Sequence, residues 1–398
     1  RRRVGDPAAL LAAALLATSP LLAYYSRMFI HEMLLTLFGV AALLMALVKP
    51  RWGLAGLMVG LMFAAKESFA ISILAWSAAA LWLLWEERAS LEAGWWRRWW
   101  RPLLLAASLA LFATLLCYTH GFSHWRGAWD AVRTFFVYQT VEGHDKPWYY
   151  YVQLLVWPDR APGVWWYGTP VAALALLAFA RGFHPETRPE LRRVMRFLGY
   201  SILAHLLIYS TFAYKTPWLA CLPWAMICLL AGCALVDLPQ RAARSRIAIA
   251  VLAILCLGSQ WHQAQLACGR FDNDPRNPYA YVPTRRDVEG LEQWLKSLRE
   301  MEPTLGSGRI AVVGRGYWPL PWYLRDFSSV GYWAEQSELP ADLERVPLVL
   351  AMPDLDGVVR KRLEATHVAQ ARSLRNEVPV IVYVERGLWD RWKEVKEP

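Results

Sequence analysis

The stretch Tyr24-Tyr25-Ser26-Arg27-Met28-Phe29-Ile30-His31-Glu32-Met33 separates two apolar runs, residues 8–23 and 33–48. Each run is long enough to cross, or nearly cross, a hydrocarbon core of about 30 Å. Arg27, His31 and Glu32 are therefore charged or chargeable groups at a membrane edge. Interfacial Tyr and Arg often only anchor helix ends, and this alternative stays open for Arg27 and the tyrosines. Glu32 is different, because a carboxylate at a helix mouth is costly without a partner.

The composition indicates a membrane protein with a soluble tail. Of the 398 residues, 56% are hydrophobic and only 19% are charged, and the charges are concentrated in short loops and beyond residue 262. Long apolar runs of this kind are typical of transmembrane helices. The net charge of +10 does not imply a nucleic-acid partner, because cytoplasmic loops of membrane proteins collect Lys and Arg.

The apolar runs predict a mainly α polytopic membrane protein with a small C-terminal α/β domain. We expect a transmembrane domain over residues 1–262, a linker rich in Asn and Pro over 263–283, and the α/β domain over 284–398. Nine segments are expected to span the membrane: 8–25, 32–48, 53–65, 69–85, 102–118, 164–180, 197–213, 218–236 and 247–262. Segment 53–65 is short for a span at about 1.5 Å of rise per residue, so a thinned, re-entrant or kinked element is expected there.

Basic residues predict the orientation of these segments. If the first three arginines are cytoplasmic, they and the inner loops together hold 17 Lys and Arg residues, whereas the longer opposing loops hold seven. The positive-inside rule favours this orientation. The loops at 24–32, 66–68, 119–163 and 214–217, together with the whole tail, are then expected on the extracytoplasmic side of a plasma membrane.

The loop over residues 119–163 is long and aromatic. Aromatic residues near helical spacing predict an amphipathic helix on the outer membrane surface: Trp125, Trp129, Phe135, Phe136 and Tyr138. Further aromatic residues flank His144, Asp145 and Arg160. Such stacking platforms beside polar groups suit a sugar or a polyprenyl phosphate, and plain interfacial anchoring is the alternative.

The predicted spans contain few polar side chains that could be functional. His205 lies within the seventh segment, where a lone histidine is more often a hydrogen bonder in the helix bundle than a ligand. The six cysteines have neither metal-ligand spacing nor a disulfide framework, so we interpret them as small apolar fillers.

Alternating helical and strand patterns beyond residue 283 predict a small α/β sheet domain. We expect helices over 288–301, 321–327 and 358–365, and strands over 309–313, 346–352 and 378–384. The first strand is followed by Gly314-Arg315-Gly316, which lacks the third glycine of a dinucleotide fingerprint. It is interpreted as a turn, with anion binding by its amides and Arg315 as the alternative.

The outer ends of the helices collect carboxylates and cations. They are Arg27, His31, Glu32, Lys66, Glu67, His144, Asp145, Lys146, Arg160 and Lys215. Carboxylates can hold a divalent metal such as Mg²⁺ or Mn²⁺, or accept a proton from a nucleophile. Lys and Arg can neutralise a phosphate. A lipid-linked phosphate sugar needs both kinds of group at a membrane edge, so the sequence predicts a site for such a lipid.

These motifs also carry a family resemblance. The stretch from Tyr24 to Glu32 resembles the second outer loop of GT-C superfamily membrane glycosyltransferases, which include protein O-mannosyltransferases and the aminoarabinose transferases of lipid A. Ala64-Ala65-Lys66-Glu67-Ser68 looks like the Thr-Lys-Glu or Thr-Lys-Gly step that follows it. Three further motifs look more specifically like the prokaryotic flippase-activity-associated family of archaeal glycosylation clusters: Tyr214-Lys215-Thr216-Pro217-Trp218, Trp318-Pro319-Leu320-Pro321-Trp322-Tyr323-Leu324-Arg325 and Val330-Gly331-Tyr332.

The resemblance implies an enzyme that transfers a sugar from a polyprenyl-phosphate donor on the outer face. It implies an essential acidic pair in a first outer loop, and we expect that loop and the first two spans to lie upstream of Arg1. Glu32 matches the second-loop acidic position, often Asp in relatives, which assists metal or donor-phosphate binding. The other substrate-binding candidates are Arg27, His31, Lys66, Glu67, His144, Asp145 and Lys215.

Two other functions stay open. The same charges could bind or help flip a lipid-linked saccharide without any chemistry, in a flippase-associated membrane protein. A solute transporter would instead need ionisable residues at mid-membrane and repeat symmetry, and the sequence offers only His205 and no obvious repeat. The expected partners are the lipid-linked sugar, membrane lipids and a protein or glycan acceptor of unknown identity.

Overall fold

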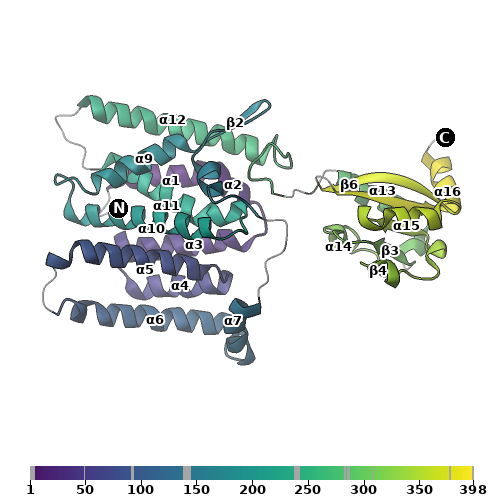
Figure 1. Cartoon of the computed structure of the whole chain (residues 1–398), viewed down its shortest axis with the longest axis horizontal. Coiled ribbons are helices and arrows are strands. Elements are labelled where there is room, and N and C mark those ends of the chain that lie inside the picture. The colour runs from purple at the N-terminus through teal and green to yellow at the C-terminus, as the bar shows by residue number, and fades with distance from the viewer. Residues whose placement is uncertain are drawn as a thin grey trace. The chain divides into compact units, whose positions relative to one another are not determined.

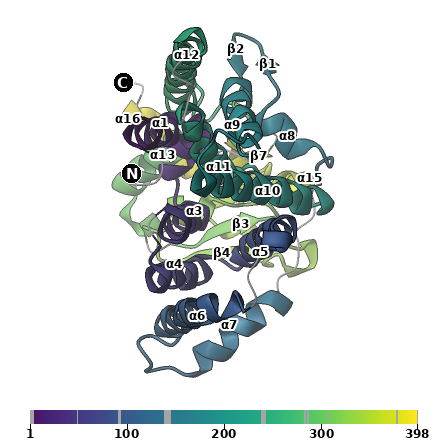
Figure 2. The same ribbon diagram turned by 90° about the vertical axis from the view of Figure 1, so that its left-hand side faces the viewer.

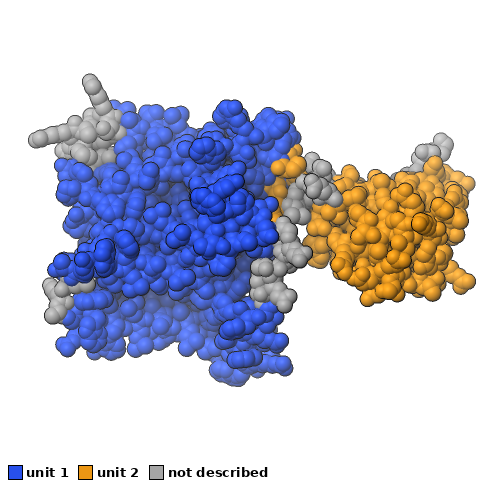
Figure 3. Space-filling view, in the orientation of Figure 1, with its two compact units in different colours: residues 1–272, 276–279 blue, residues 273–275, 280–398 orange. Residues whose placement is uncertain are grey.

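The computed structural model describes residues 5–48, 50–90, 94–137, 145–236, 243–281, 284, 287–306, 308–375 and 378–396. The chain forms two compact units (Figure 3), one of residues 1–272 and 276–279, the other of residues 273–275 and 280–398. We call them the helical unit and the tail unit and describe each by itself.

The helical unit is an up-and-down bundle (Figure 1). Its elements are α1 (Asp6–Thr18), α2 (Pro20–Ser26), α3 (His31–Leu43) with its π-helical extension (Leu44–Val48), α4 (Trp52–Ala65), α5 (Phe69–Glu86), α6 (Trp96–Tyr118), α7 (Arg126–Val137), α8 (Tyr150–Leu155), β1 (Asp159–Ala161), β2 (Val164–Trp166), α9 (Thr169–Arg181), α10 (Pro189–Thr211), η3 (Pro217–Ala220), α11 (Cys221–Gly232) and α12 (Ala243–Cys268). Successive long helices run in opposite directions, so α2, α4, α10 and α12 end where α3, α5 and α11 begin.

The unit is a multi-pass membrane protein, but nine full spans are not confirmed. Among the described residues, six helices are long and apolar enough to cross a membrane, or seven if α1 and α2 form one bent span. The predicted segments 53–65 and 164–180 correspond to shorter apolar helices, α4 and α9. A helix of 14 residues such as α4 rises only about 21 Å, less than the hydrocarbon core.

Local chemistry explains two further differences from the predicted segments. The first predicted span, 8–25, bends by 59° between α1 and α2, because Pro20 cannot continue the hydrogen bonding of α1. Ser19 then begins α2, and its hydroxyl accepts a hydrogen bond from the Leu22 amide at 3.3 Å. The predicted span 164–180 begins as the β1–β2 hairpin, so its helix starts only at Thr169.

Small residues decide how closely α4 and α6 approach each other. A Cβ atom on Gly56 would lie 2.0 Å from the Ala106 carbonyl oxygen, and one on Gly60 would lie 2.3 Å from that of Ala110. Two glycines four residues apart let helix backbones touch in a membrane. Figure 2 shows α4 between α3 and α6, with α11 among α3, α9 and α10. Nearly every residue of α11 is buried.

The tail unit confirms the predicted α/β domain. Its elements are α13 (Asp287–Met301), β3 (Ile310–Val313), α14 (Leu320–Tyr323), β4 (Val330–Trp333), β5 (Leu348–Ala351), α15 (Pro353–Leu363), β6 (His367–Arg375), β7 (Val378–Glu385) and α16 (Arg386–Lys396). The strand order is β4-β3-β5-β7-β6. Strands β4, β3 and β5 are parallel, whereas β7 is antiparallel to β5 and to β6.

Two strands of this sheet, β4 and β6, were not predicted. Both are edge strands with at least one residue exposed on each, so neither has the continuous apolar run that identifies a buried strand. The buried strands β3 and β5 do have it.

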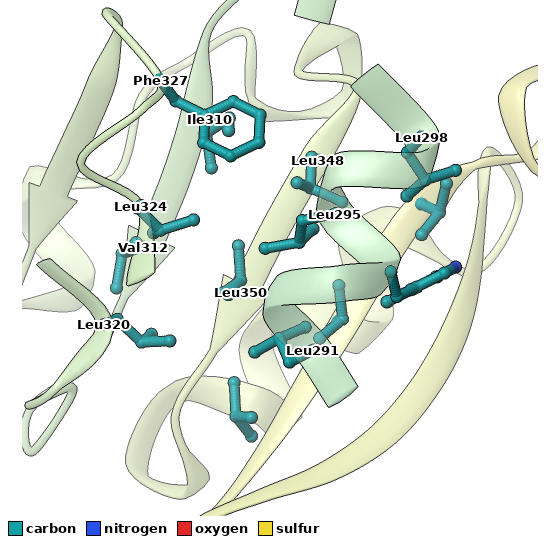
Figure 4. Packing of buried hydrophobic residues seen from close by; sticks show 14 of the residues in the cluster. Leu291, Leu295, Leu298, Ile310, Val312, Leu320, Leu324, Phe327, Leu348 and Leu350 are labelled. Carbon is teal, nitrogen blue, oxygen red and sulfur yellow. The ribbon is translucent and has the colours of Figure 1, made fainter. Parts of the chain in front are cut away.

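Each face of the sheet carries its own hydrophobic core. Leu291, Leu295 and Leu298 of α13 pack on one face with residues of β3, β5 and α14 (Figure 4). Val359 and Leu363 of α15 pack on the other face. The helices that follow β3 and β5 therefore lie on opposite sides of the sheet.

Candidate functional site

An ion pair joins two of the predicted site residues. Glu32 lies in the first turn of α3 and is 3% exposed, and Lys66 directly follows the last residue of α4. The Lys66 ammonium donates to the Glu32 carboxylate. A carboxylate at a helix start and a cation at a helix end both interact favourably with the helix dipoles. The antiparallel packing of α3 and α4 brings these two ends together.

The corner between α10 and α11 lies against Glu32. Tyr209, near the end of α10, and Cys221, at the start of α11, both interact electrostatically with the Glu32 carboxylate. The Tyr209 ring lies 5.6 Å from that of Tyr151, whose hydroxyl donates to the Thr216 carbonyl at 3.1 Å. Glu32 thus meets groups from α4 and the 209–221 corner, and Tyr151 of α8 supports that corner.

The same corner buries Lys215, which is 1% exposed. Its ammonium donates to the carbonyl oxygens of Lys146, at 3.2 Å, and of Phe212. Across the described part of the chain, these carbonyls are its partners, and no carboxylate pairs with it. A buried ammonium group that lacks an anion is costly. Lys215 is therefore a candidate for binding an anionic ligand.

Backbone pairing brings Asp145 to this corner. Asp145 and Tyr214 form an antiparallel bridge, and the Lys146 amide donates to the Ala213 carbonyl at 3.1 Å. Residues 145–146 are thus held beside 213–214, although about 70 residues separate them along the chain. His144, the neighbouring candidate, lies outside the described residues.

The structure does not bring the remaining candidates to the Glu32–Lys66 pair. The Arg27 guanidinium is exposed and donates to the carbonyl of Cys268, the last residue of α12. His31 is exposed at the first position of α3. Glu67 interacts with Tyr118 at the end of α6. Arg27 thus caps a helix end, as a basic side chain commonly does.

Two buried polar groups, Thr36 and Ser72, were missed as candidates, and His205 was interpreted as a hydrogen bonder of the helix bundle. Thr36, Ser72 and His205 are buried within α3, α5 and α10. In the described structure the Thr36 and Ser72 hydroxyls and His205 Nε2 have no hydrogen-bond partner, while His205 Nδ1 lies 2.8 Å from the Ser201 carbonyl oxygen. Thr36 lies one helical turn from Glu32 on α3, and His205 lies one helical turn from Tyr209 on α10. This spacing was the signal in the sequence that could have placed them near the site.

The donor set does not fit a complete metal site. No group of three His, Cys, Asp or Glu side chains that could hold an ion occurs within the residues that the structure describes. The Glu32 carboxylate is engaged with Lys66, and hard divalent cations need several oxygen ligands. The role of a metal therefore stays a proposal, and no step below uses one.

The opposite ends of α5 and α10 carry a separate charged network. Arg196 pairs with Glu86 at 2.8 Å and with Glu87 at 2.7 Å, and the Tyr200 hydroxyl also donates to Glu86. Arg193 pairs with Glu87 at 2.9 Å from a more exposed position. These contacts join the end of α5 to the first turns of α10. Glu32 lies near the opposite ends of these two helices.

Comparisons with known proteins show which class this fold resembles. A multi-pass helical unit with paired and buried charges at one set of helix ends, followed by an α/β unit, resembles the architecture of GT-C superfamily membrane glycosyltransferases. Residues 1–118 match the family described as dolichyl-phosphate-mannose-protein mannosyltransferase. The predicted superfamily resemblance is confirmed, whereas the narrower likeness to the flippase-activity-associated family stays a prediction.

Solved structures support the same fold. The crystal structure of ArnT from Cupriavidus metallidurans in the apo state aligns with a TM-score of 0.61 and 15% identity, over 98% of this chain and 80% of that chain. The structure of the same protein bound to undecaprenyl phosphate gives a TM-score of 0.59 and 16% identity, over 98% and 81%. A comparison with curated protein sequences gives no match.

Proposed function

We propose that the chain is a membrane glycosyltransferase that takes a sugar from a polyprenyl-phosphate donor. The observation that carries this is the Glu32–Lys66 ion pair beside the corner that buries Lys215. Two cations and a carboxylate at adjacent helix ends match a phosphate joined to a sugar. The shared fold with ArnT, whose structure is also known bound to undecaprenyl phosphate, supports a polyprenyl-linked donor.

Each residue has a defined role in this proposal. Lys66 and Lys215 bind the donor phosphate, whereas Arg27 holds the end of α12. Glu32 holds the Lys66 ammonium in place and orients the donor, because a buried carboxylate beside a cation fixes that cation's position. A divalent metal at Glu32 remains part of the proposal.

We place the site on the extracytoplasmic face. Basic residues are concentrated in loops at the opposite ends of the helices, which favours a cytoplasmic position for those loops. Helix α12 ends at the same end of the bundle as α4 and α10. The tail unit is then proposed to lie on the extracytoplasmic side.

The proposal is tested by sugar transfer in membranes that contain the protein with any upstream segment. Labelled polyprenyl-phosphate sugars are supplied, and label leaving the lipid is compared between wild type and Glu32→Gln. Transfer that collapses in Glu32→Gln is the expected result. Transfer at the wild-type level in Glu32→Gln would refute the role of Glu32 in the site, although the proposed glycosyltransferase activity would stand.

A second candidate function is non-catalytic binding of a lipid-linked saccharide in a flippase-associated protein. The observation in its favour is that Lys66 neutralises the Glu32 carboxylate, so this carboxylate is engaged in an ion pair and not available as a base. Donor binding without turnover, in wild type and across several sugars, would favour this function over transfer.

A further inference from the structure

The carboxyl ends of β3 and β5 form a point where the chain connections diverge. After β3 the chain enters α14, whose Leu320 packs in the core shared with α13. After β5 it enters α15, whose Val359 and Leu363 pack in the core on the opposite face. In open α/β sheets, ligands bind beyond the carboxyl ends of neighbouring strands whose connections diverge in this way.

Polar contacts hold the backbone at this point. The Arg315 amide donates to Asp354 Oδ2 at 2.8 Å, and the Arg315 guanidinium pairs with Glu335, which follows β4. Gly314 has φ +99°, and a Cβ atom there would lie 2.4 Å from Asp354 Oδ1. Glycine at position 314 therefore lets the backbone after β3 approach Asp354 at the start of α15.

Aromatic residues lie within this loop, in the helix α14 that follows it and on the neighbouring strand β4. Trp318 and Trp322 are 63% and 62% exposed, although large aromatic side chains are usually mostly buried. The Arg325 guanidinium lies 4.4 Å above the Trp322 ring. The Tyr317 and Tyr332 rings are 4.9 Å apart. We call Trp318, Trp322, Tyr317, Tyr332 and the Arg315–Glu335 pair the aromatic edge.

We propose that the aromatic edge of the tail unit is a saccharide-binding site. Exposed indole rings stack against the C–H faces of sugar rings, and a neighbouring Arg–Glu pair with Asp354 supplies donors and acceptors for hydroxyl groups. The ligand class is a neutral or weakly charged glycan. Its identity as the acceptor or product of transfer rests on the proposed function, whereas sugar binding itself does not.

The charges at the aromatic edge favour a sugar over a lipid surface. Segments that bind anionic membranes carry Lys and Arg clusters with few acids. Here Arg315 is paired with Glu335, and Asp354 lies beside its amide. Arg325 at the Trp322 ring also lies 3.6 Å from a carboxylate, that of Glu292. Cations accompanied by acids favour directional hydrogen bonding over attraction to anionic lipid.

The test uses the whole chain in lipid nanodiscs and measures binding of soluble sugars by saturation-transfer NMR. The probes are methyl α-mannopyranoside, methyl β-glucopyranoside and chitotriose. Trp318→Ala/Trp322→Ala and Arg315→Gln/Glu335→Gln are compared with wild type. The control is Trp129→Ala, which removes an equally exposed tryptophan from α7 of the helical unit. Thermal unfolding verifies that each variant is folded.

Binding of at least one probe by wild type and by Trp129→Ala, weakened by about tenfold or more in both double variants, is the expected result. Equal binding by wild type and Trp318→Ala/Trp322→Ala would overturn the proposal, as would no binding of any probe by wild type.

Nanodiscs that contain brominated lipids distinguish sugar binding from insertion of the aromatic edge into the membrane. Quenching of the emission that Trp318 and Trp322 contribute would show both rings in lipid and overturn the proposal. None of these measurements uses a donor lipid. A protein that fails to transfer sugar in the test of the proposed function can therefore still be tested here for sugar binding.

Discussion

The Lys66 ammonium at the end of α4 is ion-paired with the buried Glu32 carboxylate in the first turn of α3. Thirty-four residues separate the two along the chain, and the antiparallel packing of two apolar helices brings them together. The pair has two separable roles, one in holding α3 against α4 and one in the proposed donor site.

Lys66→Met should impair both roles of the pair. It leaves Glu32 buried without its cation, so we expect the free energy of unfolding to fall by about 3 kcal/mol. Binding of undecaprenyl phosphate should also weaken, because a phosphate loses one cation. Thermal unfolding in detergent and lipid binding by native mass spectrometry measure the two effects.

Glu32→Gln/Lys66→Met is the matched control for that variant. It removes both charges, so much of the lost stability should return while donor binding stays weak. Undiminished donor binding by Lys66→Met would rule out Lys66 as a phosphate ligand.

Lys215→Met tests the buried cation at the α10–α11 corner. The carbonyls of Lys146 and Phe212 lose their donor, which should lower stability by about 1–3 kcal/mol. Affinity for undecaprenyl phosphate should fall by about tenfold or more, because a charge-assisted hydrogen bond is lost. Arg126→Gln, at an exposed cation on α7, is the control and should bind the lipid as wild type does. A Lys215→Met protein that is less stable but binds normally would leave Lys215 a purely structural role.

Arg196→Gln tests the network at the opposite ends of α5 and α10. Arg196 pairs with both Glu86 and Glu87 and is largely buried, so we expect a loss of about 1–3 kcal/mol. Arg193→Gln removes a more exposed pair with Glu87 and should cost under about 1 kcal/mol. Thermal unfolding measures both. Donor binding should be unchanged in each, and a parallel loss of binding would contradict the separation of this network from the site.

Gly56→Ala tests the close approach of α4 and α6. The added Cβ would meet the Ala106 carbonyl oxygen at 2.0 Å, so the helices must move apart at a cost of about 1–3 kcal/mol. Gly258→Ala on α12 is the control, because a Cβ there meets no atom within 4 Å. Equal unfolding temperatures for the two variants would show that α4 and α6 do not pack closely.

The acid stability of the tail unit should depend on two exposed carboxyls. Hydrogen bonds from Arg309 and Arg362 lower the pKa of Asp342 and of Glu344 below their ordinary values of 3.8 and 4.5. Because the folded-state pKa values are depressed, this stabilisation is present above about pH 4.5 and is lost as the pH falls through the folded values. Protection of tail peptides against hydrogen exchange, corrected for the intrinsic rate at each pH, should therefore fall below pH 4 more in wild type than in Asp342→Asn/Glu344→Gln. Identical pH profiles would contradict these shifts.

The sequence predicted the superfamily resemblance and a group of charges at one set of helix ends. Apolar runs predicted the membrane helices, because a helix in lipid must be apolar whichever helices it packs against. Short-range motifs around Glu32 and Lys66 indicated the superfamily, and buried strands β3 and β5 were found from their apolar runs.

The sequence could not give the partners of the charges. Glu32, Lys66, Asp145 and Lys215 were predicted as one outer group, yet only packing decided that Lys66 meets Glu32 and that Lys215 is held by carbonyls. Arg27 was grouped with them and instead meets the end of α12. Contacts between segments far apart in sequence depend on helix packing, for which a single sequence has no local signal.

By itself, the sequence determined that this chain enters a membrane, that a soluble α/β unit follows, and that charges gather at one set of helix ends. These follow from composition and periodicity, which act residue by residue. The tertiary structure decided which charges are paired, that two apolar segments are too short for a full span, and that the connections after β3 and β5 pass to opposite faces of the sheet. Those properties depend on distances between elements, and such distances are set only when the helices and strands pack.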